Sequence, residues 1–412
     1  MTWEQYVRNG AASREVIDGF LTGPGWAAFG PELGYVSQNS LVPWGIDDSR
    51  TIETFGPTGA RSAFLYADRV PRINTYGDSF TEGNQVSDGE TWQQYLAGHL
   101  GEPIGNYGVG GYGIYQAYRR MVREESAEHG AEYVILYVWG DDPVRSLMRA
   151  RWLQRYPWFA DLSRRNLQFH GNPWAHIELD LSTGRFTEHE SLLTTPASVY
   201  SLCDPDWLWE HLGDDLAVQL YAYGAGLTTE LDHEKADALA GHLGFDFHGA
   251  TDPREQANRP LRVYGQRATS HIPDLARSYA VAIGKKLLVA LDFTARIGVG
   301  GPARELGTPI GDGERTDQLI VDHLAGGGFD CFDMNEVHRL EYERMAPTSL
   351  SYTDYLGLYR VRGGHYKPAR QPPVRVRDQG LVGRAAGPQA AAVPRAQHQR
   401  ADRLRRLPAR FH

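Results

Sequence analysis

Apolar runs and helix-like runs alternate along most of the chain from about residue 67. The expected strands lie at 71–77, 103–108, 131–139, 285–293 and 329–334. The expected helices lie at 89–100, 114–130, 272–284 and 315–327. The stretch 132–139 is apolar almost throughout, which is typical of a strand covered on both faces. The alternation therefore predicts a parallel sheet with helices on both sides.

Two segments depart from this pattern. Residues 1–66 contain a helical stretch at 13–21 and turn-forming and β-forming residues at 31–56, which predict an attached helix and hairpin with no candidate for chemistry. Residues from about 143 to 265 are rich in Trp, Tyr, His and turn residues. We expect this second segment to be an insertion over one edge or mouth of the sheet.

The charge of the chain is uneven. The formal net charge is −9, and by our count residues 1–365 carry about −18 and residues 366–412 about +9. The acidic body gives no reason to expect nucleic acid as a partner. The Arg-, Ala- and Pro-rich tail at 369–412 lacks an apolar period, which predicts disorder or a shifted reading frame after Pro368. A basic arm for nucleic acid or acidic lipid is the alternative for this tail.

Cysteine and histidine spacing gives no case for a disulfide framework, a metal or a cofactor. Cys203 and Cys331 are far apart, and His233, His242 and His248 do not fall on one helical face. The first residues lack a basic stretch followed by an apolar one, and no run of 18 apolar residues occurs. We therefore expect a cytoplasmic protein that does not enter a membrane, of undetermined oligomeric state.

Candidate chemistry begins with "INTYGDSFTEG" at 73–83, where Ser79 follows an expected strand. Catalytic groups of α/β sheets collect at the carboxyl ends of the strands. At that place the Ser79 hydroxyl can be exposed while nearby backbone N–H groups face a developing negative charge. Gly77 permits a close backbone approach, and Asp78 can hydrogen-bond the loop and hold the turn.

These residues resemble the first sequence block of the SGNH or GDSL hydrolases, which are esterases, lipases and carbohydrate deacetylases. "NYGVGG" at 106–111 resembles their second block, and "GGHYKPA" at 363–369 resembles their last. The resemblance covers about residues 67–368, apart from the insertion. It implies a three-layer α/β/α hydrolase domain with a parallel, flavodoxin-like sheet.

The resemblance also implies a mechanism and a substrate class. Ser79 would be the nucleophile, His365 the general base, and the N–H groups of Ser79 and Gly111 the oxyanion donors. The substrate would be a small-molecule or carbohydrate ester, cleaved by a serine esterase or deacylase through an acyl-serine.

Two positions depart from the family pattern. The third block normally supplies an asparagine amide to the oxyanion, whereas this chain has Asp141 or Asp142 after Gly140. A carboxylate cannot donate a hydrogen bond, so Asp141 could help only if protonated, and its alternative role is to cap the turn. In the family, an acidic residue usually lies three residues before the histidine, whereas this chain has Arg362 at that position.

Another acid would therefore have to orient the imidazole. Our choice is Asp354, with Asp333 behind it, and a Ser–His dyad without an acid is also open. His338 is the reserve base if His365 does not reach the serine.

Two other functions are open. Residues 108–113 satisfy G-x-G-x-x-G, the dinucleotide-binding pattern, which would indicate a nucleotide-binding oxidoreductase, although they follow the second strand of the series. The missing asparagine and the missing acid favour a catalytically weakened SGNH-like binding protein. The tryptophans of the insertion could line an acyl or sugar pocket or form its small core.

Overall fold

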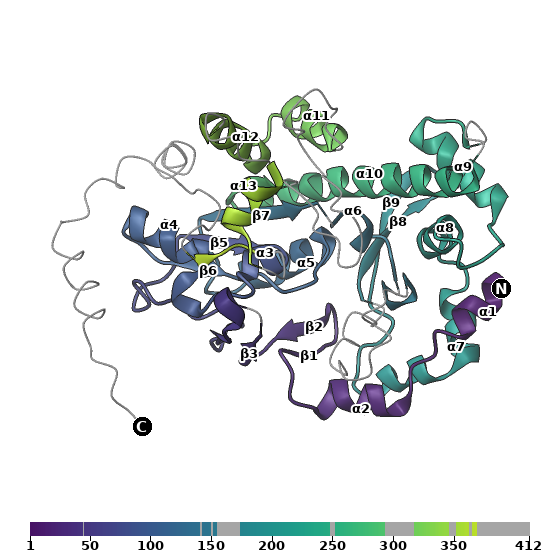
Figure 1. Ribbon diagram of the computed structural model, residues 1–412, viewed down its shortest axis with the longest axis horizontal. Helices are drawn as coiled ribbons and strands as arrows, with labels where there is room; N and C mark the ends of the chain where they lie inside the picture. The colour runs from purple at the N-terminus through teal and green to yellow at the C-terminus, as the bar shows by residue number, and fades with distance from the viewer. Residues whose placement is uncertain are drawn as a thin grey trace.

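The computed structural model describes nine stretches of the chain (Figure 1). They are residues 1–43, 45–140, 142–149, 151–154, 174–247, 252–292, 317–345, 352–361 and 365–368. The basic tail at 369–412 and Asp141 lie outside the described residues, as do Arg362 and His248. Within these nine stretches, no helix has the length and apolarity to cross a bilayer.

Five parallel strands form the central sheet, which confirms the predicted mixed α/β class. In chain order they are β5 (Ile73–Tyr76), β6 (Ile104–Asn106), β7 (Tyr133–Trp139), β10 (Lys286–Asp292) and β11 (Cys331–Asp333). Their spatial order is β6–β5–β7–β10–β11, with β7 between β5 and β10. Numbered along the chain this is 2-1-3-4-5, the order of flavodoxin-like sheets, whose switch point lies between the first and third strands.

Alternate residues of the central strand β7 pack on opposite layers of helices. Val134, Leu136 and Val138 belong to the larger apolar cluster, which includes buried residues of α5 (Ile114–Glu125), α10 (Pro253–Ala282) and α11 (Gln318–Gly326). Ile135 and Tyr137 belong to a second cluster. That cluster draws on α4 (Trp92–Leu100), α12 (Met334–Met345) and α13 (Tyr352–Tyr359). The described residues thus place the sheet between two layers of helices. This arrangement is expected when alternate residues of a central strand are buried on opposite faces of the sheet.

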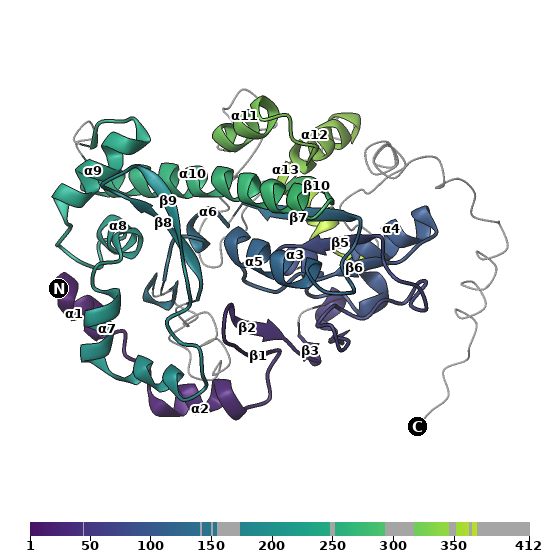
Figure 2. The same ribbon diagram turned by 180° about the vertical axis from the view of Figure 1, so that it is seen from behind.

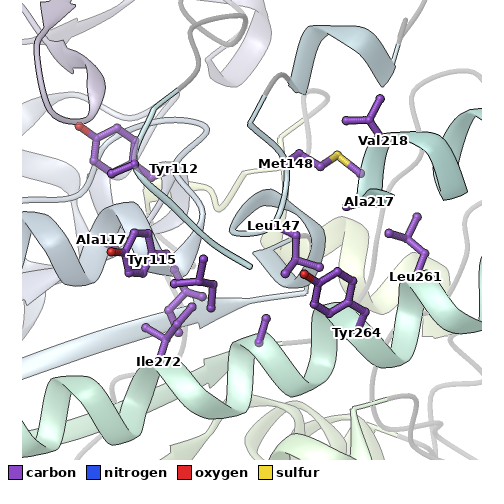
Figure 3. Packing of buried hydrophobic residues seen from close by; sticks show 14 of the residues in the cluster. Tyr112, Tyr115, Ala117, Leu147, Met148, Ala217, Val218, Leu261, Tyr264 and Ile272 are labelled. Atoms are coloured by element: carbon purple, nitrogen blue, oxygen red, sulfur yellow. The ribbon is translucent and has the colours of Figure 1, made fainter. Parts of the chain in front are cut away.

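The insertion shares its core with the sheet. It contains a hairpin of β8 (His176–Asp180) and β9 (Arg185–His189), with α6 (Asp142–Arg145), α7 (Pro205–Leu212), α8 (Leu216–Gly224) and α9 (His233–Leu243). Figure 3 shows Tyr115 and Ala117 of α5 near Leu147, and Tyr264 on the long helix α10. One apolar cluster therefore runs from the sheet into the insertion.

Helix α10 begins well before the helix that the sequence predicted at 272–284. It spans 30 residues and starts inside the expected insertion, with Pro260 and Pro273 within it. Its length carries it from α9 and α8 to the sheet, as Figures 1 and 2 show. The sequence predicts that the insertion ends near 265, whereas the backbone continues through that point as one helix.

The N-terminal segment has two distinct parts. Helices α1 (Trp3–Arg8) and α2 (Arg14–Thr22) lie beside α7 and its neighbours (Figure 2). Two antiparallel hairpins follow, formed by β1 (Ala27–Gly30) with β2 (Gly34–Ser37) and by β3 (Ser40–Val42) with β4 (Thr51–Glu53). The sequence predicted one helix and one hairpin in this segment, and these hairpins contact the candidate site described next.

Candidate active site

Ser79 lies just beyond the carboxyl end of β5, as the first residue of the short helix α3 (Ser79–Glu82). The Asp78 carboxylate caps this turn by accepting the Phe80 N–H at 2.9 Å. A Cβ at Gly77 would come within 2.1 Å of a Thr81 oxygen, so only glycine fits between strand and helix. The roles predicted for Gly77 and Asp78 are therefore confirmed in the local structure.

His365 reaches Ser79 although the two are 286 residues apart. The His365 Nε2 atom lies 2.8 Å from the Ser79 Oγ, which is hydrogen-bonding distance. Within residues 73–83, Ser79 is the one residue that keeps partial exposure. The hydroxyl is thus accessible and in contact with a potential base.

Gln85 holds the other side of the imidazole. Its side-chain oxygen lies 2.5 Å from the His365 Nδ1. Because an amide oxygen only accepts, Nδ1 carries the proton and Nε2 presents its lone pair to Ser79. Gln85 is buried with φ of +68°, a left-handed conformation that glutamine rarely adopts. Strain of this kind is commonly retained at functional sites.

The predicted orienting acids do not hold the base. Both ring nitrogens of His365 are engaged by Ser79 and Gln85. Asp354 is exposed on α13, and Asp333 caps the start of α12 through the Asn335 N–H at 3.0 Å. The choice of Asp354 is therefore corrected to Gln85. Sequence reasoning missed Gln85 because it considered only acids for this position.

The reserve base His338 has a different position. It is fully buried, and its two ring nitrogens lie 3.0 Å from the Tyr355 hydroxyl and 3.3 Å from the Tyr366 hydroxyl. The Tyr366 hydroxyl in turn donates to Asp292 at 2.7 Å. His338 thus supports Tyr366, the neighbour of His365, and does not replace the base.

The backbone amides of Ser79 and Gly111 are the oxyanion donors that the sequence predicts. The Ser79 N–H opens a helix, where amides have no intrahelical acceptor. Gly111 has φ of +79°, which glycine adopts without strain, and its carbonyl accepts from Arg151 at 3.0 Å. Within the described stretches neither amide donates a hydrogen bond. Asp141, the third predicted oxyanion residue, lies outside them.

Glu82 ties the glycine loop to the helix that carries Ser79. Its buried carboxyl accepts the Gly110 N–H at 2.7 Å and the Ser37 hydroxyl at 2.6 Å. The Asn106 side chain donates to the Glu82 carbonyl at 3.1 Å. Gly111 is therefore positioned relative to Ser79 by side chains from α3, β2 and β6.

Arg61 of the N-terminal segment holds the loop that presents Gln85. Its guanidinium donates to the carbonyls of Glu82, Gly83 and Val86 at 2.6, 2.8 and 2.6 Å, and to the Asp88 carboxylate at 2.9 Å. The segment that the sequence interpretation left without a role thus positions the site. No sequence signal distinguishes Arg61 from a surface arginine.

The surroundings keep His365 uncharged. Burial is the largest cause, followed by the positive charges of Arg360 and Arg145, and together they lower the pKa of His365 to about 3. A neutral imidazole is the form that can accept a proton from a hydroxyl.

The chain matches no model of a known protein family, and no curated protein is detectably similar to it. Within the part of the chain that the structure describes, no group of three or more His, Cys, Asp or Glu side chains could hold a metal ion.

Replacing Gln85 by leucine should lower kcat about ten- to a hundredfold. Leucine has a similar size but cannot accept the Nδ1 proton, so the imidazole loses a hydrogen bond and its tautomer is no longer fixed. Steady-state hydrolysis of p-nitrophenyl acetate measures this loss. Unchanged kcat in a folded Gln85→Leu protein would show that Gln85 does not orient the base.

Acid should destabilise the fold below about pH 6.5. Burial lowers the pKa of His176 to about 3 and that of His338 to about 4, alongside His365. The unfolded chain binds protons on these residues near pH 6.5, whereas the native state does not. Stability present above pH 6.5 is therefore lost as the pH falls toward 4. Urea unfolding at several pH values tests this, and a free energy of unfolding constant over that range would contradict it.

Proposed function

We propose that the chain is a serine hydrolase of the SGNH or GDSL type that cleaves carboxylic esters through an acyl-serine intermediate. The observation that carries this proposal is the 2.8 Å contact between the Ser79 hydroxyl and the His365 Nε2. A serine hydroxyl is a weak nucleophile until a base takes its proton, and this contact supplies the base.

The surrounding fold supports the proposal. Ser79 follows β5, the first strand of the sheet, and the glycine loop follows the neighbouring strand β6. Both are at the carboxyl ends of parallel strands, where α/β proteins place ligands. The three layers and the 2-1-3-4-5 order agree with the SGNH hydrolase fold that the motifs imply.

In the proposed acylation step, the Ser79 Oγ attacks the ester carbonyl carbon and its proton passes to the His365 Nε2. The carbonyl π electrons move to oxygen and give a tetrahedral oxyanion. The carbon–oxygen bond to the alcohol then breaks, and His365 gives its proton to the leaving oxygen. Water attacks the acyl-serine by the same route, so that the acid is released and the Ser79 hydroxyl is restored.

Backbone amides would stabilise the oxyanion. The N–H groups of Ser79 and Gly111 are the candidates, since neither is engaged within the described stretches. A single donor of this kind contributes on the order of 10²- to 10³-fold in rate. Glu82 would thus contribute to the proposed mechanism indirectly, because it holds the loop that contains Gly111.

A catalytically weakened binding protein is the second candidate. The observation that favours it is the uncharged partner of the imidazole, because Gln85 cannot balance a developing imidazolium as a carboxylate does. The dinucleotide alternative has less support. The Gly110 amide of its motif is engaged by the Glu82 carboxyl, a group that would repel a phosphate.

Hydrolysis of p-nitrophenyl acetate and butyrate by the wild-type and Ser79→Ala proteins tests the proposed function. We expect turnover by the wild type, loss of turnover in Ser79→Ala, and no change in Ser278→Ala, which alters a helical serine bonded to the Asp274 carbonyl. Turnover unaffected by Ser79→Ala would refute the nucleophile. No turnover of any ester by the folded wild type would favour the binding protein.

A further inference from the structure

The insertion contains a cavity of about 80 Å³ between β8, α8, α9 and α10. That volume has room for about five to eight water-sized groups, which is the size of a small organic molecule. Half of the lining residues are leucine or alanine. Figure 3 shows three residues of the lining, Leu147, Ala217 and Tyr264, beside α10. The cavity shares no lining residue with the candidate active site, so it would serve a separate role.

The polar part of the lining carries more acid than base. It has three carboxyl groups, those of Glu178, Asp214 and Asp215. It has two basic groups, those of Arg149 and Lys235. Three negative and two positive charges leave a formal net charge of −1. A ligand with a positive charge would therefore complement the cavity.

Both basic side chains already have acidic partners. The Arg149 guanidinium donates to the Asp214 carboxylate at 2.5 Å, and the Arg149 backbone N–H donates to the Asp215 carboxylate at 3.1 Å. The Lys235 ammonium lies 3.8 Å from the carboxylate of Asp232, which is outside the lining. The positive charge of the cavity wall is thus largely offset by these neighbours.

The Glu178 side chain is half-buried at the cavity and is available to a cation. Within the described stretches its carboxylate accepts no hydrogen bond, and the His189 Nε2 lies 3.9 Å away. Burial raises the pKa of Glu178, and the charges of Arg149 and Lys235 do not cancel that effect. Both bases line the cavity, so the carboxyl on which they act faces it. A bound cation would stabilise the ionised form of this carboxyl.

The Tyr264 hydroxyl is a second polar group at the cavity. Tyr264 is 3% exposed, and its oxygen accepts the Leu179 N–H at 2.8 Å. Among the residues that the structure describes, none accepts the hydroxyl proton. Burial is the main cause that raises the pKa of Tyr264, and the Glu178 charge adds to it, so the two groups are neighbours. A buried donor without an acceptor is unfavourable, and an oxygen atom of a ligand would supply the acceptor.

We propose that this cavity binds a small organic ammonium ion that has a short branched alkyl body and one oxygen acceptor. The ammonium group donates to the Glu178 carboxylate, and the oxygen accepts the Tyr264 proton. The alkyl body packs against the leucine side chains of the wall. An anionic ligand would fit less well, because it would meet an excess of carboxyl groups.

Ligand-observed NMR titration of the purified protein with L-valinol tests the proposal. L-valinol carries an amine, a hydroxyl and an isopropyl group, and the buffer is phosphate because amine buffers would compete. We expect a Kd of about 0.1–1 mM at neutral pH, which is ordinary for so small a ligand.

Three related compounds show which group of L-valinol matters. Isoamyl alcohol lacks the amine and should bind at least about tenfold more weakly, because it loses the charged hydrogen bond to Glu178. Isobutylamine lacks the hydroxyl and should bind about fivefold more weakly, because the Tyr264 proton stays without an acceptor. L-valine, which has a carboxylate in place of the hydroxyl, should also bind more weakly than L-valinol.

Variants show whether the named residues cause these differences. Glu178→Gln should weaken L-valinol binding about tenfold or more, and Tyr264→Phe should make L-valinol and isobutylamine bind equally. Glu234→Gln makes the same charge change at an exposed residue outside the lining, and it should leave the Kd unchanged. Should Tyr264→Phe fail to fold, Glu178→Gln and the compound series still decide.

Four results would each overturn the proposal. They are no saturable binding of L-valinol up to about 10 mM, equal affinity for isoamyl alcohol, tighter binding of L-valine than of L-valinol, and an unchanged Kd in folded Glu178→Gln. None of them bears on the proposed esterase, which is tested separately by ester hydrolysis.

Discussion

The His365→Ala protein should hydrolyse p-nitrophenyl acetate about 10⁴- to 10⁶-fold more slowly than the wild type. Loss of the base leaves the Ser79 proton without an acceptor. When catalytic residues act together, removing one of them lowers the rate nearly as much as removing all of them. The loss should appear in kcat, because His365 contacts the serine Oγ at 2.8 Å and is not required to bind an acetyl ester.

The matched control is His99→Ala. His99 is exposed near the end of α4, so its loss should leave kcat within about twofold of the wild type. A folded His365→Ala protein with more than a tenth of wild-type kcat would contradict the assignment of the base. In that case the attack on the ester would use another group.

The Arg61→Ala protein should lose about 3–5 kcal/mol of folding free energy. The guanidinium is almost completely buried, and its removal leaves the Asp88 carboxylate and three loop carbonyls without their donor. Glu53, also buried, lies 3.9 Å from the same guanidinium and would lose a nearby positive charge. Urea unfolding at neutral pH measures the change.

Arg50→Ala is the control for this loss, since Arg50 is exposed in the same N-terminal segment, and it should change stability by less than about 0.5 kcal/mol. Arg61→Ala should also lower kcat, because Gln85 would no longer be held in its left-handed conformation. Equal stabilities of the Arg61→Ala and wild-type proteins would show that the loop is held by other contacts.

The sheet could be predicted because its signals are local. Each strand is a short apolar run followed by turn residues, and all five expected strands are present with shorter bounds. The helix α10 was predicted in its C-terminal part only, and Pro260 and Pro273 lie within the longer helix. Packing of α10 along the insertion and the sheet outweighs the lost backbone hydrogen bonds.

The nucleophile, the base and the glycine loop could be proposed from sequence because glycine and serine occur there at fixed positions around a strand end. Gln85 could not, because its role depends on the loop conformation and on contact with a residue 280 positions away. Arg61 was missed for a similar reason, since burial of a charged residue is decided by tertiary packing. The role of Asp141 stays a prediction.

Treatment with a fluorophosphonate, followed by mass mapping of peptides, tests the Ser79–His365 pair most directly. The account predicts one covalent adduct on the peptide that contains Ser79, formed much more slowly in His365→Ala at equal probe concentration. An adduct confined to another residue, or equally fast labelling of Ser79 without His365, would contradict it.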